Sequence, residues 1–232
     1  MSLITTPKNL WSALTSRLNA AGSFVPQLFL RLILFWEFWE AGKLKYDNIQ
    51  VGGEDLQGTI DWFSNLNFPF PFNQISASTN YTVSMVAEIL FAILILFGLF
   101  TRFAAISLII LTVVATAAVH WPENWATLSE LWKGYAISSS EYGNYKLPLI
   151  YIVMLFPLLF NGAGKFSLDY ILSKIVMGND GIQKTSDLGM WGLALMAIGV
   201  PLTFVMPYFG GLLAIAGLVV LIANKLMLPK QA

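Results

Sequence analysis

The sequence predicts an all-α integral membrane protein, and three observations support this fold class. Hydrophobic residues make up 56% of the 232 residues and charged residues only 11%, whereas soluble domains carry roughly a quarter charged residues. The mean hydropathy is +0.67. The apolar residues also lie in long runs, so we expect lipid, rather than one aqueous core, to surround them.

Six apolar runs approach the roughly 20 residues that a helix needs to cross a ~30 Å hydrocarbon layer. They lie at residues 24–41, 81–100, 103–119, 145–160, 188–206 and 208–223. We expect the first four to form a transmembrane bundle, and the last two to form a helical hairpin around Pro207. A stripe of small residues on the last helix, Gly210, Ala214 and Gly217, suits either contact with another subunit or packing within the chain.

These runs divide the chain into four regions. Residues 1–23 form a cytoplasmic interfacial amphipathic segment, and residues 24–170 form a four-helix membrane domain. Residues 171–187 form a cytoplasmic linker, and residues 188–232 form a transmembrane helical hairpin. In the first region an apolar helix face lies opposite Lys8 and Arg17, which is typical of a helix lying on the membrane surface. Two long connections, 42–80 and 120–144, are rich in aromatic side chains, and we expect them to lie at the headgroup level.

The basic residues predict the orientation. With the N-terminus in the cytoplasm, the cytoplasmic segments hold eight basic residues, at Lys8, Arg17, Arg102, Lys165, Lys174, Lys184, Lys225 and Lys230. The outer segments hold only four, at Lys43, Lys45, Lys133 and Lys146. Because cytoplasmic segments carry an excess of Lys and Arg, we expect both termini in the cytoplasm of a bacterial cell, with the chain in the inner membrane and the long connections facing the periplasm.

The composition excludes several kinds of site. The chain has no cysteine, which rules out iron–sulfur clusters and covalently attached haem. His120 is the single histidine, so a multi-histidine metal centre cannot form within one chain. The net charge is zero, which argues against nucleic-acid binding. We therefore expect no haem, no iron–sulfur cluster and no metal site, and any redox centre must be supplied by a partner or a diffusible molecule.

Ionisable side chains within the predicted spans are the candidate functional residues, because each costs about 2.5 to 3.5 kcal/mol at a helix centre. At ~1.5 Å per residue from the cytoplasmic end, Glu37 and Glu88 are expected at about 20 Å and 18 Å, with Arg31 at about 10 Å beneath them. Around them we place Glu40, Lys43 and His120. Coupled carboxylates would support proton relay, ion capture or anchoring of a polar headgroup; alternatively, Arg31 pairs with a glutamate simply to orient the helices.

From residue 25 to residue 170 the chain resembles the DoxX family of small bacterial membrane proteins. The resemblance rests on motifs in a fixed order, which are RLIL at 31–34, AGK at 41–43, WFSNLNFPFP at 62–71, Glu88, GLFTR at 98–102 and GAGKFSLD at 162–169. It implies a four-helix membrane core, with family positions at Arg31, Lys43, Glu88 and Arg102. The last two helices are additional to the usual family length.

The resemblance also implies a role beside oxidoreductase systems, some of which pass electrons to membrane quinone. We therefore expect an accessory subunit or quinone-interacting partner of a redox or metal-handling system, bound to the bilayer and to another membrane or periplasmic subunit. Quinone is the candidate cofactor, and independent catalysis is not expected. The alternatives are a small carrier or proton/metal-ion conduit that uses the intramembrane carboxylates, and a purely structural membrane anchor.

Overall fold

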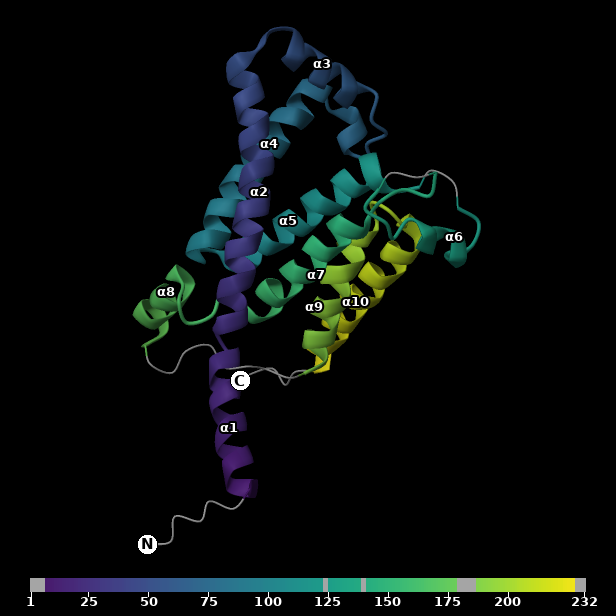
Figure 1. Ribbon diagram of the computed structural model, residues 1–232. Coiled ribbons are helices and arrows are strands. Elements are labelled where there is room, and N and C mark those ends of the chain that lie inside the picture. The colour runs from purple at the N-terminus through teal and green to yellow at the C-terminus, as the bar shows by residue number, and fades with distance from the viewer. Residues whose placement is uncertain (1–6, 123–124, 139–140, 179–186, 228–232) are drawn as a thin grey trace, which may run out of the picture.

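The computed structural model describes residues 7–122, 125–138, 141–178 and 187–227. Every regular element in these segments is a helix, which confirms the predicted all-α fold class (Figure 1). The elements are α1 (Pro7–Gly22), α2 (Val25–Val51), α3 (Gly53–Ser64), η1 (Phe72–Gln74), α4 (Ala77–Phe97), α5 (Thr101–Ala115), η2 (Thr116–His120), α6 (Leu128–Lys133), α7 (Lys146–Asn161), α8 (Leu168–Met177), α9 (Leu188–Leu202) and α10 (Pro207–Met227).

Four helical segments in the described part of the chain are long and apolar enough to cross a membrane, at Asn9–Val51, Ala77–Phe97, Thr101–His120 and Pro207–Asn224. The other two predicted spans, α7 and α9, are apolar helices of 16 and 15 residues. At 1.5 Å per residue each is about 24 Å or less in length. Their crossing of the bilayer therefore stays a prediction, whereas the membrane-protein class rests on the longer helices.

The buried core lies between α2, α4, α5 and α7. It is built mainly from branched aliphatic and small side chains, among them Leu34, Ala92, Ile95, Leu108 and Leu155, each fully buried. The outer helix faces carry exposed large apolar side chains along their length. A helical bundle with a packed interior and an apolar outer surface is the arrangement expected for helices surrounded by lipid.

The helix α2 is longer than the predicted span, which ends at residue 41. It continues to Val51 and stops only at Gly52, whose φ of 61° ends the helix. The apolar run ends earlier because charged and polar residues follow, but no Gly–Gly or Pro helix breaker occurs between residue 41 and Gly52. Residues predicted to begin an outer loop therefore belong to the α2 helix. At its other end, α1 continues in line with α2 and projects from the bundle (Figure 1); its placement on the membrane surface stays a prediction.

The hairpin of α9 and α10 packs along its glycines. A Cβ at Gly199 would lie 2.5 Å from the backbone nitrogen of Ala214, and one at Gly217 would lie 2.7 Å from the carbonyl oxygen of Gly192. The small-residue stripe of the last helix therefore faces α9 of the same chain, which settles the two alternatives in favour of packing within the chain. The hairpin in turn contacts α5 at the side of the bundle.

The first long connection is largely helical. After Gly52, α3 turns back and packs against α4 and α2, so that it covers one end of the bundle (Figure 1). Phe63 on α3 lies edge-to-face on Tyr81 of α4, with ring centroids 5.1 Å apart. We call this end, where both long connections lie, the loop end. The opposite end, where α4 and α7 terminate and α5 begins, is called the arginine end.

Candidate functional site

Arg31 is buried at the arginine end, with 3% of its surface exposed. The guanidinium does not pair with a carboxylate as predicted but donates to backbone carbonyls. Nε donates to Ile95 at 2.8 Å and Nη2 to Leu96, both near the end of α4. Nη1 donates to Ala163 at 3.2 Å and Phe166 at 2.6 Å, in the segment after α7. Through these bonds Arg31 joins α2 to the end of α4 and to the segment between α7 and α8.

Arg102 acts in the same way on the neighbouring helix. It lies in the first turn of α5, and its Nη1 donates to the carbonyls of Leu159 at 2.9 Å and Phe160 at 2.8 Å, in the last turn of α7. A cation at a helix C-terminus also interacts favourably with the helix dipole. The basic residue of the GLFTR motif therefore has a structural role in joining α5 to α7.

Asp169 completes this network from α8. Its carboxylate accepts the backbone N–H groups of Phe100 at 2.8 Å and Thr101 at 2.9 Å, which open α5. Between α4 and α5, Gly98 has a φ of 61°, and a Cβ there would lie 2.6 Å from the Cβ of Ser167. The motifs at 98–102 and 162–169 thus hold each other in place, which gives them a helix-capping role.

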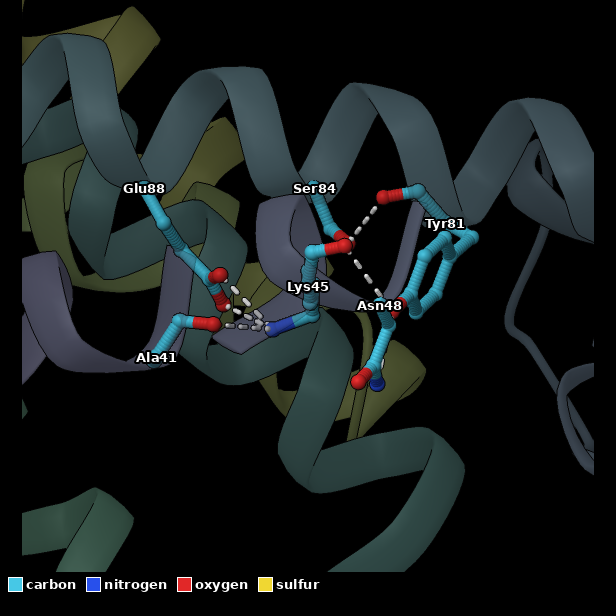
Figure 2. Close-up of polar contacts among 6 residues, drawn as sticks. All are labelled: Ala41, Lys45, Asn48, Tyr81, Ser84 and Glu88. Atoms are coloured by element: carbon cyan, nitrogen blue, oxygen red, sulfur yellow. Dashed lines mark hydrogen bonds and ion pairs between the residues drawn. The ribbon is translucent and has the colours of Figure 1, made fainter. Parts of the chain in front are cut away.

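The ion pair of Lys45 and Glu88 is the main polar feature toward the loop end (Figure 2). Lys45 Nζ on α2 lies 2.8 Å and 2.7 Å from the two carboxylate oxygens of Glu88 on α4. Only 19% of the lysine side chain and 12% of the glutamate side chain are exposed. The ammonium also lies 3.5 Å from the carbonyl oxygen of Ala41, which is the weakest of its contacts.

Close helix packing and further polar contacts fix this pair. A Cβ at Gly42 would lie 3.0 Å from the Cβ of Glu88, so the absence of a side chain lets α2 and α4 meet here. One to two turns further along, the Tyr81 hydroxyl donates to the Lys45 carbonyl at 3.3 Å and accepts from Asn48 Nδ2 at 3.4 Å. Ser84 Oγ donates to the Tyr81 carbonyl at 2.8 Å. Figure 2 shows these side chains between the two helices.

A cavity of about 490 Å³ adjoins the ion pair. Its floor is apolar and comes from α4 and α5, its cover is the aromatic segment around α3, and its polar groups include Lys45, Glu88 and Ser84. The aromatic and aliphatic lining consists of Trp62, Phe63, Leu66, Phe68, Phe72, Val83, Ala87, Ile110, Leu111, Val114, Ala115, Ala118 and Val119. A mainly apolar cleft with a few convergent polar groups is the usual form of a small-molecule site. We call it the outer cavity.

His120 lies at the edge of the outer cavity. It ends η2, a π-helical turn that continues α5, and such turns are frequent at functional sites. Its Nδ1 lies 2.8 Å from the Oδ1 of Asn144, so the ring is held against the second long connection. No group of three or more His, Asp or Glu side chains suited to a metal ion occurs among the described residues.

The structure does not bring the other predicted residues to this site. Glu37 is exposed on a different face of α2, toward α7, and accepts a hydrogen bond from the Tyr151 hydroxyl of α7. Because Glu88 lies beside Gly42, Glu37 is about 7.5 Å nearer the arginine end along α2, and its partner is Tyr151 of α7. The predicted coupling of the two carboxylates is therefore wrong, because the depth count assumes that the helices start at one level and ignores which face each residue occupies.

The two remaining predicted residues also lie outside the outer cavity. Lys43 is half-exposed and forms an ion pair with Asp47 one turn further along α2. Glu40 is exposed on the same helix. Neither side chain contributes to the lining of the outer cavity.

Lys45 is the charged residue of the site that was not predicted from the sequence. The buried face of α2 carries Gln27, Arg31, Leu34, Phe38 and Gly42, at spacings of three or four residues that are typical of one helix face. The next position on this face is residue 45. The helical period extended past residue 41 therefore places Lys45, and not Lys43, beside α4.

Comparison with known proteins establishes the family. The family model for DoxX matches residues 27–121. A relative from Haemophilus influenzae, described as an uncharacterised protein, is 39% identical over 161 residues, which are 68% of this chain and 91% of the relative. The chain belongs to the DoxX family. No solved structure matches this DoxX protein.

The family match bears on both ends of the molecule. It covers α2, α4 and α5, and so includes the helices that supply the ion pair and much of the outer cavity. It also includes Arg31 and Arg102 of the capping network. The acceptor carbonyls of these arginines in and after α7, at residues 159–166, lie beyond the match.

Proposed function

We propose that this DoxX protein binds a quinone headgroup in the outer cavity and acts as a quinone-interacting accessory subunit of a membrane redox system. The observation that carries the proposal is the Lys45–Glu88 ion pair beside a mainly apolar cavity within the membrane bundle. An ion pair at this depth is expensive in lipid and calls for a role beyond packing. Quinones combine a flat ring bearing two polar oxygens with an apolar tail, which suits this lining.

The chemistry of the pair matches both redox forms of a quinone. A carbonyl oxygen of the oxidised ring would accept a hydrogen bond from Lys45 Nζ, in place of the long 3.5 Å contact with the Ala41 carbonyl. A hydroxyl group of the reduced ring would donate to a carboxylate oxygen of Glu88. Aromatic rings such as Phe63 and Phe68 line the same space and provide stacking surfaces for the headgroup.

An accessory role also fits the exposed polar contact between α2 and α7. Glu37 is exposed at membrane depth, with Tyr151 as its hydrogen-bond partner. An ionisable side chain that faces lipid is expensive, and a helix of a partner membrane subunit with a cationic or donor side chain would cover it. Because the sequence contains no cysteine and one histidine, such a partner would also supply the redox centre.

The proposal includes an orientation in the bacterial inner membrane. The arginine end would face the cytoplasm and the outer cavity the periplasm. Support comes from the basic side chains Arg102, Lys165 and Lys174, which lie at or near the arginine end, since cytoplasmic segments favour such residues. A conduit that uses Glu37 and Glu88 receives no support, because the two carboxylates have different partners.

Quinone binding by the purified protein tests the proposal. Protein in mild detergent should retain membrane quinone, detectable by mass spectrometry, and should bind added ubiquinone or menaquinone. Lys45→Met should weaken binding about tenfold or more, because a hydrogen bond to a charged group contributes about 1.5–3 kcal/mol. Lys43→Met is the matched control, two positions away on the exposed side of α2, and should bind as the unchanged protein does.

Two results would reject this function. Equal affinity of the Lys45→Met and Lys43→Met variants would show that the ion pair does not contact the quinone. A correctly folded protein that retains and binds no quinone would favour the structural anchor. Glu88→Gln provides a further variant that keeps the side-chain shape while it removes the charge, and it should weaken binding of the reduced quinone more than that of the oxidised form.

A further inference from the structure

A second cavity, of about 560 Å³ and more polar than the outer cavity, lies at the arginine end. It is formed by the first turn of α5, the segment that follows α7, the beginning of α8 and Ser23 before α2. Its lining includes Arg102, Asn161, Lys165 and Asp169. None of these residues lines the outer cavity. This space, which we call the inner cavity, is therefore a separate candidate site.

The charges around the inner cavity favour an anion. Both carboxylate oxygens of Asp169 already accept backbone N–H groups, while Arg102 uses Nη1 for the carbonyls of α7. The Nε and Nη2 groups of Arg102 and the ammonium of Lys165 form no hydrogen bond or ion pair with the described residues. Among the lining residues the two cations Arg102 and Lys165 stand against the single carboxylate of Asp169, so the local charge is positive.

The surface beside the inner cavity is apolar. Phe100 and Phe103 line it and are 63% and 61% exposed, and Phe166 beside Lys165 is 63% exposed. Exposed phenylalanines at this density belong in the acyl-chain region, whereas the neighbouring Arg and Lys side chains extend to the headgroups. A ligand that suits both parts carries an anionic group at one end and a hydrocarbon chain at the other.

We propose that the inner cavity binds the phosphate group of an anionic phospholipid. Arg102 would donate to phosphate oxygens through its free guanidinium N–H groups, and Lys165 would contribute a flexible positive charge. The acyl chains would run past Phe100 and Phe103 into the bilayer. Basic pockets between transmembrane helices recognise such headgroups in general. The bound lipid would also join α5, α7 and α8 at the point where the capping network holds them.

Lipid binding to the full-length protein tests this site. Native mass spectrometry and thermal unfolding in neutral detergent would be measured with added phosphatidylglycerol, phosphatidylcholine or inorganic phosphate. We expect retention of phosphatidylglycerol, a rise in Tm with that lipid, and no comparable effect of phosphatidylcholine. Lys165→Gln should weaken phosphatidylglycerol binding about fivefold, since one basic residue near an anionic lipid surface contributes about 1 kcal/mol.

Lys174→Gln is the matched control. Lys174 is exposed on α8, at the same end of the bundle, and does not line the inner cavity, although its ammonium lies over the ring of Tyr170, which does. This variant should bind phosphatidylglycerol like the unchanged protein. Equal losses in both variants would mean nonspecific attraction and would overturn the proposal, as would stabilisation by phosphatidylcholine. An equal rise in Tm with inorganic phosphate alone would assign the cavity to a soluble anion and reject the lipid.

Discussion

Lys45 and Lys43 show how the face of a helix decides the role of a side chain. Lys43 pairs with Asp47 on the exposed side of α2, where both side chains are 50% exposed, and such surface pairs contribute about 0–1 kcal/mol. Lys45 is mostly buried against Glu88. Removing one member of a buried pair leaves a charge without compensation, whereas removing both members restores balance.

This difference predicts a non-additive effect on stability. Lys45→Met should lower the free energy of unfolding by about 1–3 kcal/mol, less than for a fully buried pair because the outer cavity admits solvent. The double substitution Lys45→Met with Glu88→Leu should recover most of the loss. Thermal unfolding in detergent of both single variants and the double variant measures the coupling. Additive losses would show that the two side chains do not interact.

At the scale of the helices, the arginine end explains why the family motifs lie where they do. Arg31 reaches the end of α4 and the segment after α7, and Arg102 reaches the end of α7. Both residues are recognisable from the sequence as unusual charges near the membrane. Their partners are not, because backbone carbonyls are present at every position and only the packed helix ends leave them unpaired.

Replacing Arg31 should therefore disrupt the bundle more than an ordinary surface change. Arg31→Leu removes the donor of the Leu96, Ala163 and Phe166 carbonyls, while Ile95 keeps its bond from the Gly98 N–H. Each buried carbonyl left unpaired costs about 1–3 kcal/mol, so we expect a sharp fall in Tm and in the yield of monodisperse protein. Arg31→Lys should rescue only part of the loss, because one ammonium cannot reproduce the spread of the guanidinium donors. Arg17→Leu is the control, since Arg17 is exposed and donates within its own helix to Ala13. A Tm for Arg31→Leu equal to that of the control would refute the capping role.

The same scale shows what the sequence could predict. Hydropathy located α2, α4, α5 and the hairpin because long apolar runs have few alternatives to helices in lipid. It placed the end of α2 too early, because a helix can continue after its apolar run stops. Counting depth along the helices predicts Glu37 as the neighbour of Glu88. The spacing of three or four residues from Arg31 through Gly42 predicts Lys45 in that place, and Lys45 is the residue that pairs with Glu88.

For the whole molecule, the two cavities lie toward opposite ends of the bundle, so the proposed orientation assigns them to opposite membrane surfaces. The absence of cysteine makes this directly measurable. Lys174→Cys at the arginine end and Ser64→Cys at the end of α3 each introduce a single thiol. In intact cells a membrane-impermeant maleimide should label only Ser64→Cys, and Lys174→Cys should react after the membrane is opened. The reverse pattern would invert the orientation.

Photolabelling with an azido-quinone tests most directly whether the outer cavity holds the headgroup. After irradiation and digestion, the label should lie on the peptides that line the outer cavity, at 62–88 and 107–120, and an excess of unmodified quinone should remove it. A third cavity, of about 470 Å³ between α5, α7 and α9, provides the internal comparison, because its lining is almost wholly apolar. Label concentrated on α9 at Ala197, Ile198 and Leu202, with none on α3 or α4, would contradict the account.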